Sequence, residues 1–354
     1  MALTGLAMIS ALLLQRPDSA ASRSDGGIRL SGWVTTSITS STRPEGRSVV
    51  GRMYGGREAR IVLNLADLAI ERVPAVDRWD AGFRIEPILG TSARIVRAGG
   101  LDLGRDADLW QAYAELSLPV NEATTVGIRA GKMATLMGVE GFADYANPTV
   151  DPGAQDIFLE PFSETGVQLQ IHTAIDLQLR LSRGWDRVSD NNGNATVTAR
   201  ATFSASTSAS VMVLGYSGRE QTAPGSPARS GAELIVSGRL SGRAAVWMQL
   251  DYGQEGKATW HAYGLWLDYK ASQQAGFGIR TDFVCDCDGV RTSGALGFPL
   301  QTGQRLRSIA ATLNLRRGPH LMLRPEIRLD RSSLPVFQGH REQMTGALAL
   351  SLIL

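Results

Sequence analysis

The chain has 354 residues, of which 43% are hydrophobic and 20% charged, and its formal net charge is +2. One soluble all-β domain seldom exceeds roughly 250 residues, and this composition is not that of a disordered chain. The nearly balanced charge argues against nucleic acid as a partner, since nucleic-acid binding usually needs a concentrated basic face.

Residues 1–21 are expected to be a secretory signal peptide. The stretch ALTGLAMISALLL (2–14) is apolar, and small residues follow at 18–22, as they do at a cleavage site. No Lys or Arg precedes the apolar core, so the true start could lie upstream or the signal could be a weak one; a short buried helix is the alternative. Residues 22–354 are expected to form one domain, because no linker or break in composition divides them.

Sixteen stretches of alternating apolar and polar side chains follow along the chain. In a strand, successive side chains point to opposite faces, so each stretch would carry one apolar and one polar surface. In the clearest stretch, Leu323 and Ile327 fall on one face while Arg324 and Arg328 fall on the other. The predicted strands are 28–38, 60–72, 82–91, 110–118, 125–132, 165–172, 176–184, 195–203, 209–217, 231–237, 244–252, 260–270, 274–284, 306–316, 320–330 and 343–354.

The connections between these strands alternate in length, which favours a membrane barrel over a soluble sandwich. Outer-membrane barrels have an even number of strands, short periplasmic turns and long outer loops. The short connections include 119–124, 173–175, 204–208, 238–243, 271–273 and 317–319, and the long ones include 39–59, 92–109, 133–164, 185–194, 218–230, 285–305 and 331–342. The fold class expected is therefore all-β: a closed transmembrane antiparallel β-barrel of about 16 strands. No run of about 18 apolar residues after the N-terminus predicts a membrane-spanning helix.

Charged residues of these strands are expected to line the lumen. An Arg on the lipid face at mid-depth costs about 2–4 kcal/mol, so a strand with two or three charges must turn them inward. The predicted pore-lining residues are Arg60, Arg84, Glu86, Glu115, Arg180, Arg280, Asp282, Arg324, Glu326, Arg328 and Asp330.

Aromatic residues near strand ends are typical of the girdles that barrels place at the two membrane interfaces. Ordinary packing in a core is the alternative. The residues concerned are Trp33, Trp79, Trp110, Trp185, Tyr216, Trp247, Tyr252 and Trp260.

Residues 134–164 form the longest predicted connection, and a loop of about 30 residues in a compact fold is normally functional. It carries acids together with apolar side chains such as Phe158 and Phe162. We expect it to fold into the lumen and narrow it, with its acids facing the strand arginines across water; an external lid or packed outer cap is the alternative. The acids assigned to this constriction loop are Asp144, Asp151, Asp156, Glu160 and Glu164.

Cys285 and Cys287 are the only cysteines, and they are two residues apart. A disulfide at that spacing would be strained, and a metal site would want more ligands, since none of the four histidines is near in sequence. Two incidental loop thiols are the simpler interpretation, and a reversible disulfide in an oxidising compartment is the alternative. No metal ligands and no cofactor are expected.

The segments LWQAYAELSLPV (109–120) and NPTVDPGAQDIFLEPFSETGVQL (147–169) resemble the outer-membrane family called putative β-barrel porin-2, or OmpL-like. Further similar blocks are GWVTTSIT (32–39), LNLADLAIERV (63–73), TVGIRAGKMATLMGVE (125–140), GWDRVSDNN (184–192) and TLNLRRGPHLMLRPEIRLDRSS (312–333). The resemblance implies an outer-membrane pore and supplies no catalytic residues. The chain departs from the family in ending with Leu354, where outer-membrane strands usually end in Phe or Trp, and residues 216–274 match only in pattern.

The leading hypothesis is an outer-membrane porin that passes small hydrophilic solutes by diffusion through a constriction formed by residues 134–164. A non-conducting structural or adhesion barrel is the second, because small inner-face residues such as Ala347, Ala349 and Ser351 leave room for a plug. A barrel enzyme such as a lipid hydrolase is the third, but no Gly-x-Ser-x-Gly elbow, phosphate-binding loop or His-Glu-x-x-His motif occurs, so no enzyme is expected. The expected partners are outer-membrane lipid, small hydrophilic solutes and, by analogy with sixteen-stranded porins, two further copies of the chain.

Overall fold

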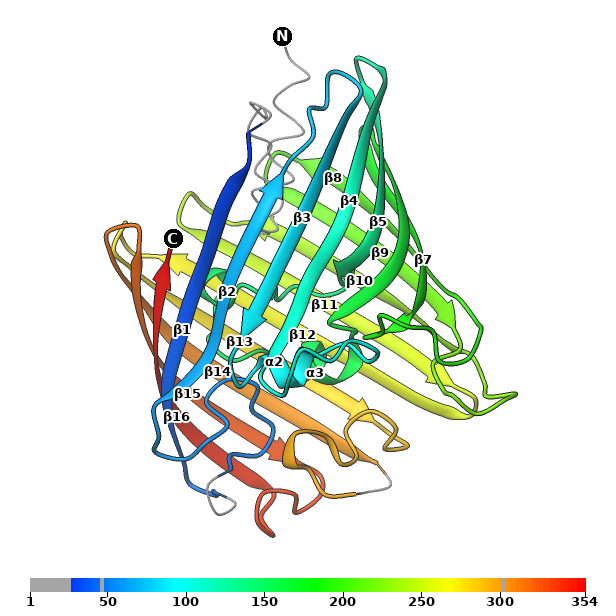
Figure 1. Cartoon of the computed structure of the whole chain (residues 1–354). Helices are drawn as coiled ribbons and strands as arrows, with labels where there is room; N and C mark the ends of the chain where they lie inside the picture. Colours follow the sequence, from blue (N-terminus) through cyan, green and yellow to red (C-terminus); the bar gives the residue numbers. More distant parts are fainter. Residues whose placement is uncertain (1–26, 45–47, 301–302) are drawn as a thin grey trace.

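The computed structural model describes residues 27–44, 48–300 and 303–354, so the predicted signal peptide (1–21) lies outside the described residues. Sixteen antiparallel strands form a closed barrel in which each strand pairs with its neighbours in sequence and β1 pairs with β16 (Figure 1). The strands are β1 (Arg29–Ser41), β2 (Val62–Arg72), β3 (Asp80–Leu89), β4 (Ala107–Asn121), β5 (Thr124–Ala134), β6 (Ser163–His172), β7 (Ile175–Trp185), β8 (Thr196–Ser206), β9 (Ala209–Gly218), β10 (Arg229–Arg239), β11 (Ala244–Glu255), β12 (Ala258–Lys270), β13 (Ala275–Asp286), β14 (Gln304–Arg317), β15 (Leu321–Ser332) and β16 (Glu342–Ile353).

Each of the sixteen predicted strands corresponds to one of these, so the predicted fold class is confirmed. The side chains also alternate as expected. On β15, Leu323 and Ile327 are 37% and 65% exposed on the outer face, whereas Arg324 and Arg328 are 0% and 3% exposed on the inner face. Large apolar side chains lie on the outside of most strands, which is the opposite of a soluble sandwich and is the arrangement of a barrel surrounded by lipid.

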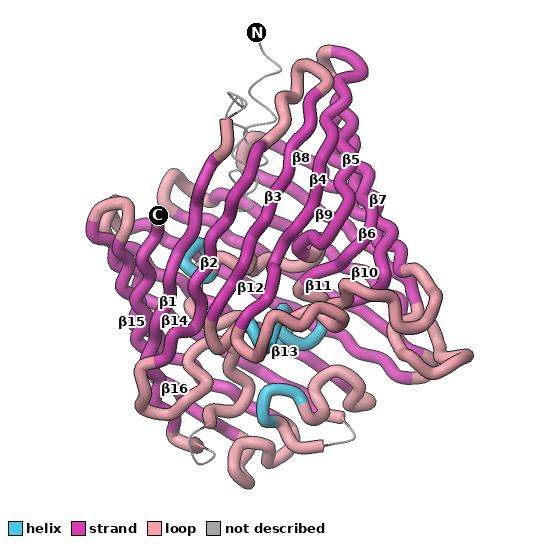
Figure 2. The backbone as a smooth tube through the Cα atoms, in the orientation of Figure 1, coloured by secondary structure: helices cyan, strands magenta, loops and turns pink. Residues whose placement is uncertain are grey.

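The connections at one end of the barrel are short and most of those at the other end are long (Figure 2). The link between β11 and β12 breaks this alternation, because only residues 256–257 separate the two strands. The long loops carry four short helical segments: α2 (Ala93–Val96), η2 (Asp144–Ala146), α3 (Ala154–Leu159) and η3 (Ala295–Gly297). Within the described residues, no helix has the length and apolar character needed to cross a bilayer.

Simple alternation fails on β2. The register shifts between the pairs Thr35–Leu65 and Thr36–Leu63, so Asn64 is an extra residue, and both Asn64 and Leu65 are fully buried. A bulge of this kind turns a side chain that alternation assigns to one face toward the other. Leu65, which strict alternation would place on the outer face beside Leu63, therefore lies in the interior.

The aromatic girdle is mostly a wrong prediction. Only Trp79 and Tyr252 among the eight residues are exposed, whereas the others are buried. Trp33 and Trp110, for example, contact Phe142 of the long loop between β5 and β6. Five of these rings, those of Trp33, Trp110, Trp185, Tyr216 and Trp260, belong to apolar clusters that include loop residues inside the barrel. The buried aromatic residues are Trp33, Trp110, Trp185, Tyr216, Trp247 and Trp260.

Candidate functional site

The predicted pore-lining charges lie on the inner wall of the barrel, with one exception. Glu115 is half-buried on β4, where its carboxylate pairs with the guanidinium of Arg129 on β5 at 3.1 Å. Arg60 is the exception: it is exposed and precedes β2, because that strand begins at Val62 and the predicted strand began two residues too early. The nine others are buried: Arg84, Glu86, Arg180, Arg280, Asp282, Arg324, Glu326, Arg328 and Asp330.

The loop between β5 and β6 (residues 135–162, here called L3) lies inside the barrel, as predicted. It reaches strands far from its own: the Asp144 carboxylate accepts a hydrogen bond from Thr35 Oγ1 of β1 at 3.0 Å, and the backbone N–H of Val139 donates to Gln249 Oε1 of β11 at 2.9 Å. Between these points, the backbone N–H of Ala154, the first residue of α3, donates to Asp282 Oδ2 of β13 at 2.8 Å. L3 therefore crosses the lumen. Small inner-face side chains of β16, Ala349 and Ser351, are fully buried.

Direct contacts with arginines of the wall hold L3 in place. Arg328 Nη1 lies 2.8 Å from Asp151 Oδ2, and Arg280 Nη1 lies 3.3 Å from Glu140 Oε1. Arg324 donates to two backbone carbonyls of L3, those of Asp144 at 2.6 Å and Asn147 at 2.7 Å. The prediction that acids and arginines would face one another across water is thus wrong for these pairs. A charge removed from water is stable only beside a direct partner, so burial brings the groups into contact.

The other predicted loop acids have different surroundings. Glu164 belongs to β6 rather than to L3, and it pairs with Arg180 of β7 at 2.8 Å. Asp156 lies on α3 and is partly exposed. Glu160 follows α3 and is buried, with its carboxylate accepting a hydrogen bond from Gln249 Nε2 at 2.6 Å.

Sequence reasoning missed several buried polar residues. Arg52, in the loop between β1 and β2, pairs with Asp151 at 3.3 Å and with Glu326 at 3.2 Å. Glu233 of β10 and Asp251 of β11 lie directly opposite each other in register. Alternation within each strand could have placed Glu233 and Asp251 inward, but only the strand register shows that they meet.

Apolar side chains fill much of the barrel at the end that carries the long loops. A buried cluster joins L3 to four other long loops: Val50 and Met53 lie between β1 and β2, Val96 between β3 and β4, Phe298 between β13 and β14, and Phe337 between β15 and β16. L3 contributes Ile157, Phe158 and Leu159 of α3. The loops therefore fold over one another as a single packed unit, and the lumen at this end is narrowed by five loops rather than by L3 alone.

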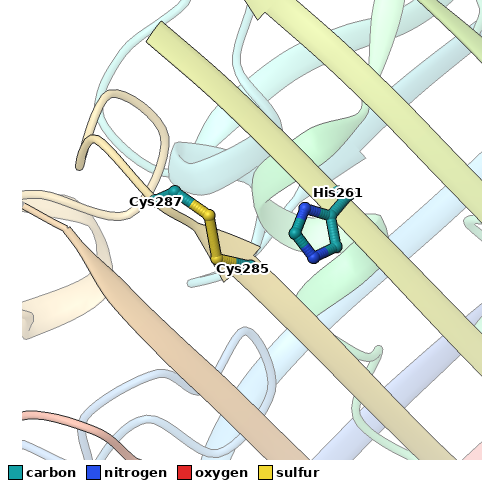
Figure 3. Close-up of side chains that lie close together, drawn as sticks. All are labelled: His261, Cys285 and Cys287. Carbon is teal, nitrogen blue, oxygen red and sulfur yellow. A yellow bond between two sulfur atoms is a disulfide. The ribbon is translucent and has the colours of Figure 1, made fainter.

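The two cysteines form a disulfide, so the interpretation as incidental thiols is wrong. Figure 3 shows His261 beside the bond. Strand pairing places His261 of β12 opposite Cys285 of β13, which is why a histidine distant in sequence is near in space. The other histidines are dispersed: His172 pairs with Asp176 at 2.8 Å, and His320 contacts the backbone carbonyl of Ile353.

Asp186, the first residue after β7, is expected to make stability depend on pH. Its carboxylate accepts hydrogen bonds from the backbone N–H groups of Phe162 and Ser163, and burial raises its pKa to about 7. The side chain of Asp in an unfolded chain has a pKa of about 3.9. The folded state therefore holds the proton more tightly, so this stabilisation is complete below the unfolded pKa and is lost as pH rises to about 7.

Asp186→Asn should abolish this loss of stability with rising pH. Asparagine also suits the positive φ of 53° at this position. The measurement is the free energy of unfolding in urea, in lipid vesicles, across this pH range. Asp190→Asn in the same loop is the control. Hydrogen bonds from the backbone of Asn192 and Gly193 lower the pKa of Asp190, so the stabilisation that Asp190 contributes is lost only at acidic pH. The Asp190→Asn variant should therefore still lose stability as pH rises to about 7. An unchanged dependence of stability on pH in Asp186→Asn would contradict the assignment.

Comparisons with known proteins yield one family and several similar folds. The profile of the family described as putative beta-barrel porin-2, OmpL-like, matches residues 27–353. Among solved structures, the chain is similar to the anion-selective porin from Comamonas acidovorans, at 12% identity and a TM-score of 0.62, covering 93% of this chain and 99% of that one. No curated protein sequence matches.

Two further structures are similar in the same way. OprB of Pseudomonas putida has 10% identity and a TM-score of 0.61, over 93% of this chain and 95% of that one. OmpT of Vibrio cholerae, an outer membrane protein described in a trimer form, has 10% identity and a TM-score of 0.59, over 93% and 99%. At such identities the likeness shows the fold alone.

Proposed function

Because this chain belongs to the putative beta-barrel porin-2 (OmpL-like) family, we propose that it forms a water-filled channel through the bacterial outer membrane. Small hydrophilic solutes diffuse passively through it, and L3 narrows the passage. One observation carries the proposal: a loop crosses the lumen of a closed barrel and is held there by charges of the inner wall, as in the contact of Arg328 with Asp151. Such a loop sets the width of a pore by occupying part of it.

The proposed path follows the wall opposite the contacts of L3 with β13 to β15. The inner-wall charges of β13 and β15, such as Arg280 and Arg324, are buried. On β4 and β5, in contrast, the inward-facing Glu115 and Arg129 are partly exposed. Charges of both signs on a wetted wall create a local transverse field, and such a passage sorts solutes by size and charge without a binding site.

Planar-bilayer recording tests the proposal. The purified, folded protein should give discrete conductance steps, and Arg129→Gln should shift the reversal potential toward cation selectivity, since it leaves the Glu115 carboxylate without its partner at 3.1 Å. Arg331→Gln is the control, because Arg331 forms an exposed ion pair with Glu342 at the rim. If the folded protein inserts into the bilayer and gives no conductance steps, the proposed channel function is wrong.

A non-conducting barrel is the second candidate, and the apolar cluster of the five loops favours it. A packed interface of Met53, Phe158, Phe298 and Phe337 excludes water where it forms. The absence of conductance steps in the same recording, together with correct folding, is the result that this alternative predicts.

The proposal also covers partners. The apolar outer face contacts outer-membrane lipid, and the chain assembles as a homotrimer by analogy with the trimer form of the Vibrio cholerae protein. No nucleic acid, cofactor or catalytic activity is part of the proposed function.

A further inference from the structure

Three buried carboxylates meet where L3 contacts the barrel wall. They belong to Glu160 of L3, Glu233 of β10 and Asp251 of β11, and each of these residues is at most 7% exposed. One oxygen from each lies within 4.8 Å of the others. The juxtaposition depends on two tertiary features: the β10–β11 register sets Glu233 opposite Asp251, and the end of α3 brings Glu160 across the lumen.

Hydrogen-bond donors do not satisfy this group. The Gln249 amide nitrogen lies 2.6 Å from Glu160 Oε1, 2.9 Å from Glu233 Oε2 and 3.1 Å from Asp251 Oδ2. An amide carries only two hydrogens, so it cannot serve all three carboxylates fully. The backbone N–H of Gly138 also donates to Glu233. Glu160 Oε2 and Asp251 Oδ1 are buried and have no hydrogen-bond partner.

The local backbone leaves room for the unpartnered oxygen of Glu160. A Cβ at position 138 would collide with Glu160 Oε2, and Gly138 has a φ of +89°, which favours glycine. Gln155 adds a third unpartnered buried atom, its Oε1, while its amide nitrogen donates to Asp251 Oδ2. Since a half-turn exchanges the two ends of an amide, Gln155 can place its oxygen where its nitrogen now lies, beside Asp251 Oδ2.

The electrostatics demand a positive species. No described ion pair involves Glu160, Glu233 or Asp251, and an ionised carboxylate buried without a partner is strongly unfavourable. Either protons or a cation must offset the negative charge. The atoms that could bind a metal ion here are all oxygens, from carboxylates and a side-chain amide. Ca²⁺ prefers such oxygen ligands.

We propose that Glu160, Glu233 and Asp251 bind one Ca²⁺ ion, which fastens L3 to the inner wall of the barrel at β10 and β11. Sequence reasoning expected no metal ligands, because the three acids are spread over about ninety residues and only the fold unites them. The binding site itself does not depend on conduction. Its consequence, that removal of Ca²⁺ loosens the constriction and alters the channel current, rests on the proposed function.

Protonation is the competing state of the cluster. Burial, followed by the nearby carboxylates of Glu233, Asp156 and Asp251, raises the pKa of Glu160 well above its usual range. Acid should therefore displace the ion, and binding is best measured at neutral to mildly alkaline pH.

The test is calorimetric titration of CaCl₂ into the refolded, chelator-treated full chain in detergent. We expect one saturable site per chain. The double variant Glu160→Gln, Asp251→Asn removes two ligands. It should weaken binding by more than the roughly 10–100-fold caused by mutating residues that only hydrogen-bond to a metal's ligands. Glu342→Gln, at an exposed rim acid, is the control and should bind like the unaltered chain. Heat-modified mobility on gels verifies folding, and Glu160→Gln alone, a loop change, replaces the double variant if that variant fails to fold.

Absence of saturable Ca²⁺ binding to the folded chain would overturn the proposal. It would indicate that protonation of the three carboxylates offsets their charge. Binding that is unchanged in the double variant would overturn it too. Because the titration is done in detergent without any current, its result is separate from that of bilayer recording. If Ca²⁺ binds and no variant or chelator changes the current, the site stands and only its effect on the channel fails.

Discussion

Replacing Arg280 by methionine is expected to release L3 from the barrel wall and to destabilise the protein by about 3–5 kcal/mol. Arg280 of β13 is 0% exposed, and its guanidinium lies 3.3 Å from the Glu140 carboxylate of L3 and 3.1 Å from that of Asp282. It also donates to Thr149 Oγ1 at 3.0 Å and to the backbone carbonyl of Asp151. Methionine would leave two carboxylates buried beside each other without a cation, which is the costly way to break a buried ion pair.

Urea unfolding in lipid vesicles measures this loss, followed by tryptophan fluorescence. Arg331→Met is the matched control, because Arg331 lies on β15, two strands from β13, and its 3.1 Å pair with Glu342 is more than half exposed. Removing an exposed pair should cost no more than about 1 kcal/mol. If the channel conducts, Arg280→Met should also give larger or noisier current steps. Equal stability of the two variants would show that Arg280 does not anchor L3.

Introducing arginine at Ile327 is expected to destabilise the barrel in a membrane by about 2–4 kcal/mol. Ile327 is at the middle of β15, on the outer face, where it is 65% exposed. Its neighbour Arg328 points to the opposite face and is buried among acids, including Asp151 and Asp330. The two positions are adjacent in sequence, so their different responses to charge arise from the face of the strand alone.

Leu321→Arg provides the depth control for this experiment. Leu321 lies on the same outer face but is the first residue of β15, at the end where the connections are short. An arginine near the interface should cost about 0–1 kcal/mol, because its guanidinium reaches water or headgroups. The free energy of unfolding from vesicles of defined thickness distinguishes the two. Equal, small losses at both positions would mean that this face does not contact the hydrocarbon of a bilayer.

Much of the wall of this protein was predictable from local pattern. Strand β15 alternates apolar and charged residues: Leu323, Arg324, Pro325, Glu326 and Ile327. A period of two assigns these side chains to two faces, and the one remaining question is which face contacts water. The length of L3 and its mixture of acids with apolar residues indicated a loop that folds inward, and its contacts with Thr35 and Gln249 bear this out. The errors lie where a local pattern is interrupted: the bulge at Leu65 and the late start of β2 that leaves Arg60 exposed.

The side-chain period and the loop lengths sufficed to predict the sixteen strands, their inverted faces and the loop that enters the lumen. The folded barrel was needed to show which groups meet: Arg52 with Asp151, His261 with the Cys285–Cys287 disulfide, and Glu160 with Glu233 and Asp251. Alternation sets the direction of a side chain, but contact requires the register between strands and the path of a loop across the bore. Both result from packing and charge pairing among residues distant in sequence, and no single segment contains that information.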